Sequence, residues 1–150
     1  MPQPDRRGLT IVEVLVLLIL LVQLLALFLP AVQKVREAAA RMKANPQWGP
    51  FAGTVGDYGL LAKNLGTDTR TAAWKSIQDG EIDLSAYGDL KDRYTAAIAL
   101  GTLLAQQTQA CIDTETNPLV DLQLKAMRDA ILQSVDALEW LADQMCDALS

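Results

Sequence analysis

Residues 8–32 read GLTIVEVLVLLILLVQLLALFLPAV, an apolar run with a single carboxylate, Glu13, near its start. Two arginines precede the run directly, and a cluster of basic side chains follows it: Lys34, Arg36, Arg41 and Lys43. At about 1.5 Å per helical residue, the stretch from Val14 to Val32 approaches the roughly 30 Å of a bilayer core. The run therefore predicts a long N-terminal helix that spans a membrane.

Two kinds of export signal also begin with basic residues and an apolar segment. A secretory signal peptide has a shorter core, of about 7–15 residues, and a small-x-small cleavage site. The alanines at 38–40 come too late for such a site and lie among charges. Arg6 and Arg7 also suggest a twin-arginine signal, but the apolar core is too long and no cleavage site follows it.

Residues 6–16, RRGLTIVEVLV, resemble the prepilin cleavage and methylation motif of type IV pilins and type II secretion pseudopilins. The shared features are a basic leader, a glycine, a hydrophobic residue, a threonine, two aliphatic residues, a glutamate and an aliphatic helix. Residues 29–42, LPAVQKVREAAARM, resemble the continuation found in planctomycete-type pilin-like proteins. The resemblance covers about the first 42 residues. Leu9 stands where phenylalanine is most typical, and the sequence after Lys43 departs from the family.

The resemblance implies roles for individual residues. A prepilin peptidase would cut between Gly8 and Leu9, and the new amino group of Leu9 would be N-methylated. Glu13 would engage the exposed N-terminus of a sister subunit during assembly, and Pro30 would kink the helix. A carboxylate inside a membrane costs a few kcal/mol, roughly 2.5–3.5 at the bilayer centre, so a protonated amine nearby would offset that cost. The implied partners are prepilin peptidase, sister subunits and the lipid bilayer.

Glu13 has a second interpretation that needs no partner. Thr10 to Glu13 has the spacing of a capping box, in which both side chains accept hydrogen bonds from free backbone N–H groups at a helix N-terminus. The negative charge would also complement the helix dipole. The two interpretations are compatible, and both remain open.

The sequence divides the whole chain into four predicted segments. We predict a prepilin leader at 1–8, a transmembrane and assembly helix at 9–45, a Gly/Pro-rich connector at 46–59 and an acidic helical head domain at 60–150. Pro46 disfavours helix at the residue before it, which places the end of the first helix near Asn45. Glycines and prolines then crowd the next dozen positions, which is typical of a loop.

The head is predicted to be helical throughout, which makes the fold class all-α. Short helices are expected near 60–65 and at 69–78, the latter capped by Asp68. The strongest helices are expected at 90–112 and at 118–149, where Asn117 is the N-cap and Pro118 takes the first helical position. Apolar stripes follow each: Leu90, Tyr94, Ala97, Gly101, Leu104, Thr108 and Cys111, then Leu124, Met127, Ile131, Ser134, Leu138, Leu141, Met145 and Ala148.

The short turn between these two helices predicts an antiparallel hairpin, packed either as a coiled coil or as an ordinary globular core. In that hairpin Cys111 lies just before the turn and Cys146 about thirty residues after it, so the two would sit roughly 40 Å apart. A disulfide tolerates about 7 Å between Cα atoms. We therefore predict no intramolecular disulfide, while a bridge between subunits stays open.

Catalytic chemistry finds little support in the sequence. The chain has no histidine, which excludes histidine-based catalysis and histidine-containing metal sites. Residues 79–83, DGEID, resemble the middle of an EF-hand loop, but Lys75, Ile77 and Ala86 occupy ligand positions, so a turn between helices is the better interpretation. We predict no enzyme, no cofactor and no metal.

The net charge of the chain after residue 42 limits the partners that it can bind. Subtracting the five basic and three acidic residues of 1–42 from the totals of 13 and 18 leaves 8 and 15 for the remainder. So acidic a segment is a poor binder of nucleic acid or anionic lipid, and no nucleic-acid partner is expected.

The prepilin-like resemblance implies a structural subunit of a pilus or secretion apparatus, anchored in the bacterial inner membrane by one helix, with its head on the extracytoplasmic side. The alternative is a membrane-tethered helical scaffold or binding domain that does not assemble. More basic residues follow the apolar run than precede it, which the positive-inside rule reads as a cytoplasmic head. A tethered enzyme would need a nucleophile and base, and no such pair is evident.

Overall fold

The computed structural model describes residues 6–149. The side chains of residues 6–11, 14, 17, 21, 24, 27, 148 and 149 are not described. Four helices account for nearly all of it: α1 (Arg6–Met42), α2 (Gly49–Asp79), α3 (Leu84–Thr114) and α4 (Pro118–Leu149). The described residues include no strand. The predicted all-α fold class is confirmed.

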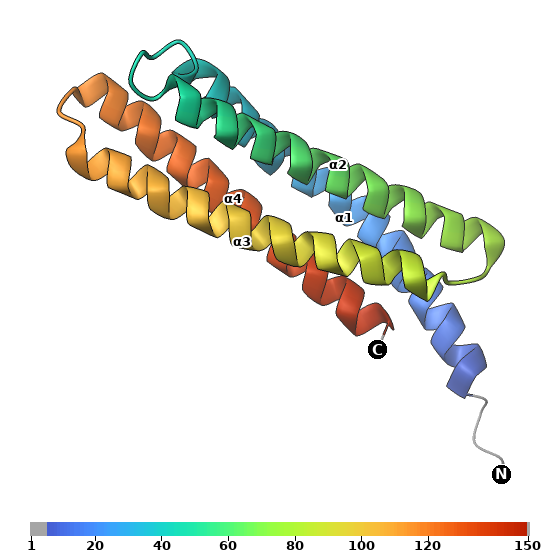
Figure 1. Cartoon of the computed structure of the whole chain (residues 1–150). Helices are drawn as coiled ribbons and strands as arrows, with labels where there is room; N and C mark the ends of the chain where they lie inside the picture. The colour runs from blue at the N-terminus through green and yellow to red at the C-terminus, as the bar shows by residue number, and fades with distance from the viewer. Residues whose placement is uncertain (1–5, 150) are drawn as a thin grey trace.

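The four helices form an up-down-up-down bundle, with each helix antiparallel to the one before it (Figure 1). Helix α1 packs against both α2 and α4, and α3 completes the ring by packing against α2 and α4. The antiparallel hairpin of the last two helices is therefore confirmed. The start of α1 projects beyond the other helices at the end of the bundle that also holds the C-terminus. The bundle follows the short-loop pattern of antiparallel helix packing.

The two apolar stripes predicted for α3 and α4 supply much of the core. Every described member of the α4 stripe is buried, including the polar Ser134. All members of the α3 stripe are buried except Cys111, which is half-buried. Helix α4 also begins where predicted, because the Asn117 side chain accepts a hydrogen bond from the Leu119 backbone N–H at 3.0 Å. A side-chain cap of this kind satisfies a backbone donor that has no partner within the helix.

The connector predicted for residues 46–59 is wrong, because α2 begins at Gly49 and runs unbroken to Asp79. Pro50 lies in the first turn, where its missing N–H costs nothing. The real connection is a short turn in which Asn45 Oδ1 accepts hydrogen bonds from the backbone N–H groups of Gln47 and Trp48, at 2.8 and 3.0 Å. The two short helices expected at 60–65 and 69–78 are therefore parts of one long helix.

Glycines in α2 serve helix packing instead of loop formation. A Cβ at Gly59 would lie 2.7 Å from Arg36 Cγ, and a Cβ at Gly66 would lie 2.9 Å from the Phe28 ring, both on α1. Such distances are too short for any real side chain, so glycine is what permits the two helices to approach. Asp68, predicted as an N-cap, lies inside α2 and forms an ion pair of 2.8 Å with Arg93 of α3.

The turn between α2 and α3 confirms the interpretation of residues 79–83 as a connection between helices. Gly80 adopts φ 68°, a left-handed conformation that favours glycine, and ends α2. Asp83 then caps α3, because its Oδ1 accepts hydrogen bonds of 3.1 Å from the backbone N–H groups of Ser85 and Ala86. The cap explains why α3 begins at Leu84 and not near Leu90 as predicted.

Glu115 ties two turns together at the other end of the bundle. Its carboxylate accepts hydrogen bonds from the backbone N–H groups of Asn117 and Thr116, at 2.9 and 3.0 Å, and from the Trp48 indole, at 2.6 Å. These donors lower the pKa of Glu115, with the Asn117 amide as the largest cause and the Trp48 indole next. The α1–α2 turn and the α3–α4 turn are thereby joined.

Helix α1 contributes one wall of the core, so the core is not confined to residues 60–150. Its buried residues begin at Leu18 and continue through Phe28 and Val35 to Met42. The helix passes through Pro30 without interruption. Within the described residues, no helix combines the length and the hydrophobicity that a membrane crossing requires.

Candidate functional site

The residues that the prepilin-like motif singles out lie at the free end of α1. Gly8 and Leu9 belong to the first turns of the helix, but the Leu9 side chain is not described, and residues 1–5 of the predicted leader (1–8) lie outside the described residues. Glu13 is exposed to solvent. Because α1 begins at Arg6, Thr10 lies inside the helix and is not its N-cap. The capping-box interpretation of Glu13 therefore does not hold for the full chain.

Helix α1 has two apolar faces, and only one of them is covered. The inner face packs into the core, where Leu18 is 0 % exposed. The outer face carries large apolar side chains in contact with solvent, namely Val12, Val16, Ile19 and Leu20. Val12, one residue before Glu13, is 60 % exposed. A row of exposed aliphatic residues on one helix marks a surface that contacts a partner or a membrane.

The structure thus brings Glu13 together with exposed aliphatic side chains on the projecting end of α1. Pro30 is also exposed, but it lies farther along, beside the bundle. The sequence could not show which face of α1 is covered, because the run is apolar on all sides and has no 3.6-residue period. The small residues of α2 were the available signal, since glycines spaced along one helix face permit another helix to approach.

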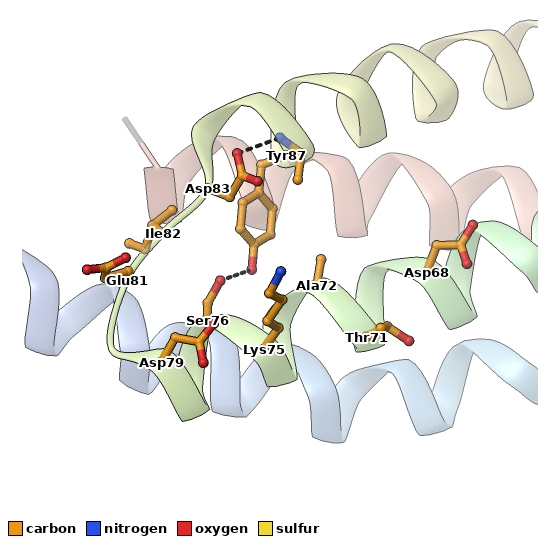
Figure 2. Close-up of a pocket in the computed structure, with 11 residues that line it drawn as sticks. Asp68, Thr71, Ala72, Lys75, Ser76, Asp79, Glu81, Ile82, Asp83 and Tyr87 are labelled. Carbon is orange, nitrogen blue, oxygen red and sulfur yellow. Dashed lines mark hydrogen bonds between the residues drawn. The ribbon is translucent and has the colours of Figure 1, made fainter.

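A cavity of about 600 Å³ lies beside the α2–α3 turn. Figure 2 shows Lys75 between Ala72 and Ser76 on α2, with the Tyr87 ring reaching across from α3 to Ser76. The Tyr87 hydroxyl and Ser76 Oγ are 2.9 Å apart. Asp83 is occupied in capping α3, and Asp68 pairs with Arg93. The Asp83 cap and the hydrogen bond between Tyr87 and Ser76 therefore hold the start of α3 against α2.

The described residues also offer no cluster of side chains suited to binding a metal ion. None of their histidine, cysteine, aspartate and glutamate side chains form a group of three that could hold a metal ion. The two cysteines, Cys111 and Cys146, are free thiols and half-buried. Burial raises the pKa of the Cys111 thiol, which makes it a poor nucleophile at neutral pH. The predicted absence of an intramolecular disulfide stays a prediction, which mass analysis without reducing agent would check.

Three tyrosines pair with small hydroxyl residues inside the bundle, and these pairs were not predictable from the sequence. Tyr58 lies 2.7 Å from Ser134 Oγ, Tyr94 lies 2.8 Å from Thr69 Oγ1, and Tyr87 pairs with Ser76. Each pair joins two helices, so the three fix the helix register where aliphatic packing alone would tolerate sliding. Burial raises the pKa of all three tyrosines, and that of Tyr94 to about 12.

We expect the bundle to lose stability in alkali because of these tyrosines. The pKa of tyrosine in the unfolded chain is near 10.0, whereas the pKa of Tyr94 in the bundle is about 12. The unfolded state therefore releases its proton first, and the free energy of unfolding falls as pH rises from about 10 through 12. Urea titrations across that range, with tyrosinate absorbance, would measure the effect.

Tyr94→Phe is the control for that prediction. The variant loses one hydrogen bond, which costs about 1 kcal/mol at neutral pH, but it no longer titrates at this position. Its stability should therefore fall less steeply above pH 10 than that of the parent chain. An identical slope in both proteins would contradict the assignment to Tyr94.

Comparisons of the chain with models of known protein families, with curated proteins and with solved structures found no match.

Proposed function

We propose that this protein is a pilin-like or pseudopilin-like structural subunit, cut after Gly8 by a prepilin peptidase and N-methylated at Leu9. Its α1 helix anchors it in the bacterial inner membrane and packs against α1 helices of sister subunits in a pilus or secretion apparatus. Helices α2, α3 and α4, with the part of α1 that packs on them, form the extracytoplasmic head. The protein is a structural component and not an enzyme.

One observation carries the proposal: the prepilin-like motif stands on the projecting end of α1, where Glu13 and exposed aliphatic residues lie together. Among the described residues there, Val12 and Val16 are 60 % and 50 % exposed. A carboxylate among exposed apolar residues needs a cationic partner once that surface enters a membrane. The amino terminus of Leu9 in a neighbouring subunit has the required charge.

A full bilayer span by residues 14–32 requires a change in the bundle. Helix α2 lies alongside the second half of that stretch and carries Lys63, Asp68 and Arg70, all exposed. These charges would be costly in hydrocarbon. In our proposal the part of α1 before Leu18 enters the membrane directly, and the part from Leu18 to Val32 enters only if it leaves the bundle.

The second candidate function is a membrane-tethered helical scaffold that does not assemble. The burial of the α1 inner face favours it, because Leu25 and Phe28, each 3 % exposed, are already used in the chain's own core. Less of α1 is then free to contact sister helices. The two candidates differ in whether Glu13 has a role between subunits.

Glu13→Ala is expected to reduce subunit association more than a hundredfold while leaving membrane attachment intact. Removing one partner of a buried ion pair costs about 3–5 kcal/mol, because the other charge stays buried without compensation. Crosslinking yields in membranes that contain the parent chain or the variant would measure the change.

Glu37→Ala is the matched control. It also removes an exposed glutamate carboxylate from α1, but at a position farther along the helix, where Glu37 faces α4 across a small groove. Crosslinking should persist in this variant. If Glu13→Ala assembles as well as Glu37→Ala, subunit assembly through Glu13 is contradicted and the scaffold is favoured.

A further inference from the structure

Charge is divided unequally between the two halves of the bundle. Residues 6–79, which form α1 and α2, carry nine basic and five acidic side chains. Residues 80–150, which form α3 and α4, carry four basic and twelve acidic side chains. The acidity that the sequence suggested for the head as a whole therefore belongs to one half, and the other half has a net charge of +4.

Two cavities are lined by residues of both α1 and α2, and we call them together the basic groove. One, of about 290 Å³, is lined by Leu29, Val32, Gln33, Arg36 and Lys63. The other, of about 590 Å³, is lined by Val22, Thr67, Arg70, Thr71, Trp74, Lys75 and Gln78. None of these lining residues is acidic. Every basic residue in both sets is exposed.

The cations of the basic groove are not neutralised within the chain. Arg36, Lys63 and Arg70 form no ion pair with a carboxylate in the part of the chain that the structure describes, where the ion pairs are Arg93–Asp68, Lys125–Asp121 and Arg128–Asp129. Each of these pairs has at least one partner on α3 or α4. The groove thus presents uncompensated positive charge.

Apolar side chains stand beside these cations. Trp74, in one of the two cavities, is 53 % exposed, and Leu29, in the other, is 42 % exposed. Tryptophan is enriched where proteins meet the interface between water and lipid, because its ring is apolar and its N–H is polar. Basic side chains near a membrane surface are attracted to anionic headgroups. The combination of basic side chains and an exposed tryptophan fits the headgroup region of an anionic lipid surface.

We propose that the basic groove docks the folded bundle on an anionic bilayer surface, with Arg36, Lys63 and Arg70 at lipid headgroups and Trp74 in the interface. The acidic α3–α4 half then faces away from the membrane, which avoids repulsion. The docked bundle lies along the bilayer, and the exposed outer face of α1 borders the contact. This inference concerns the folded bundle and does not depend on cleavage after Gly8.

Amine labelling of the full chain would test the docking. The chain is mixed with vesicles of phosphatidylcholine, either alone or with one third phosphatidylglycerol, and acylation of Lys63 is compared with that of exposed Lys91 on α3. We expect several-fold protection of Lys63 by the anionic vesicles only, reversed by about 1 M salt, at which the Debye length falls to about 3 Å. Lys91 should react equally in all samples.

Two double variants make the test specific. R36Q/R70Q removes two cations of the groove. Because each cation contributes about fivefold to the affinity for anionic lipid, the lipid concentration that half-protects Lys63 should rise about 25-fold. K125Q/R128Q removes two cations from α4 and should leave that concentration unchanged. Equal effects of the two variants would overturn the proposal, since they would show that only net charge matters.

The remaining outcomes separate docking from anchoring. If the chain floats with both kinds of vesicle while Lys63 is labelled equally in both, the basic groove does not dock and anchoring by α1 stands. If it floats only with anionic vesicles and R36Q/R70Q abolishes flotation, docking holds and the anchor fails. If Lys63 is protected without lipid, and the protection rises with protein concentration, the proposal is overturned. The basic groove would then bind the acidic α3–α4 half of a second copy.

Discussion

Gly101→Val is expected to lower the free energy of unfolding by about 3 kcal/mol, the upper end of the usual cost of overpacking a core. Gly101 is buried on α3 at the point where three helices meet. A Cβ there would lie 2.6 Å from both the Tyr58 hydroxyl of α2 and Val135 Cγ2 of α4. Displacing Tyr58 would also disturb its hydrogen bond to Ser134. Urea denaturation followed by circular dichroism would measure the loss.

Gly88→Val provides the matched control on the same helix. A Cβ at Gly88 has no neighbour within 4 Å, and valine is a slightly better helix former than glycine, by a few tenths of a kcal/mol. The variant should therefore be as stable as the parent chain or slightly more so. If Gly101→Val is tolerated equally well, the close contact of α2, α3 and α4 described above is incorrect.

Phe28→Ala is expected to destabilise the bundle by about 3–5 kcal/mol, the usual cost of truncating a buried phenylalanine. The Phe28 ring is 3 % exposed and lies against Gly66 of α2. Glycine has no side chain that could move to fill the cavity, so little relaxation can offset the loss. Chemical denaturation of the full chain in mild detergent would test this.

Leu29→Ala is the control for Phe28, because the next residue of α1 is 42 % exposed. Its truncation should cost less than about 1 kcal/mol, in keeping with the small effects of surface substitutions. The pair also reports on the position of α1. If residues 18–32 lie in hydrocarbon and not in the bundle, both variants should leave the stability of the head nearly unchanged.

The last two helices were predictable because their signals agree at every level. Asn117 and Pro118 mark the start of α4, and its apolar residues repeat at helical spacing, so cap, turn and stripe all indicate one structure. Helix α2 was not predictable in the same way. Its glycines and Pro50 are individually typical of loops, and only their position opposite the larger side chains of α1 explains them.

Helix α1 shows why a functional surface is harder to predict than a fold. Its existence follows from a long and largely apolar run, but its orientation depends on which partner covers each side. The packing of Phe28 on Gly66 and Arg36 on Gly59 fixes that orientation, and both contacts join residues far apart in the sequence. The basic groove was missed for the same reason, because Arg36, Lys63 and Arg70 come together only when α1 and α2 are paired.

The most direct test of the proposed function is the mass of the mature N-terminal peptide, isolated from cells that have a prepilin peptidase. We expect a chain that begins at Leu9 with an N-methyl group, because Gly8 separates the basic leader from the apolar helix. Gly8→Leu should block the cut and leave the leader attached. Recovery of the unaltered chain with residues 1–8 in place, in cells whose peptidase processes other substrates, would show that the proposed function is wrong.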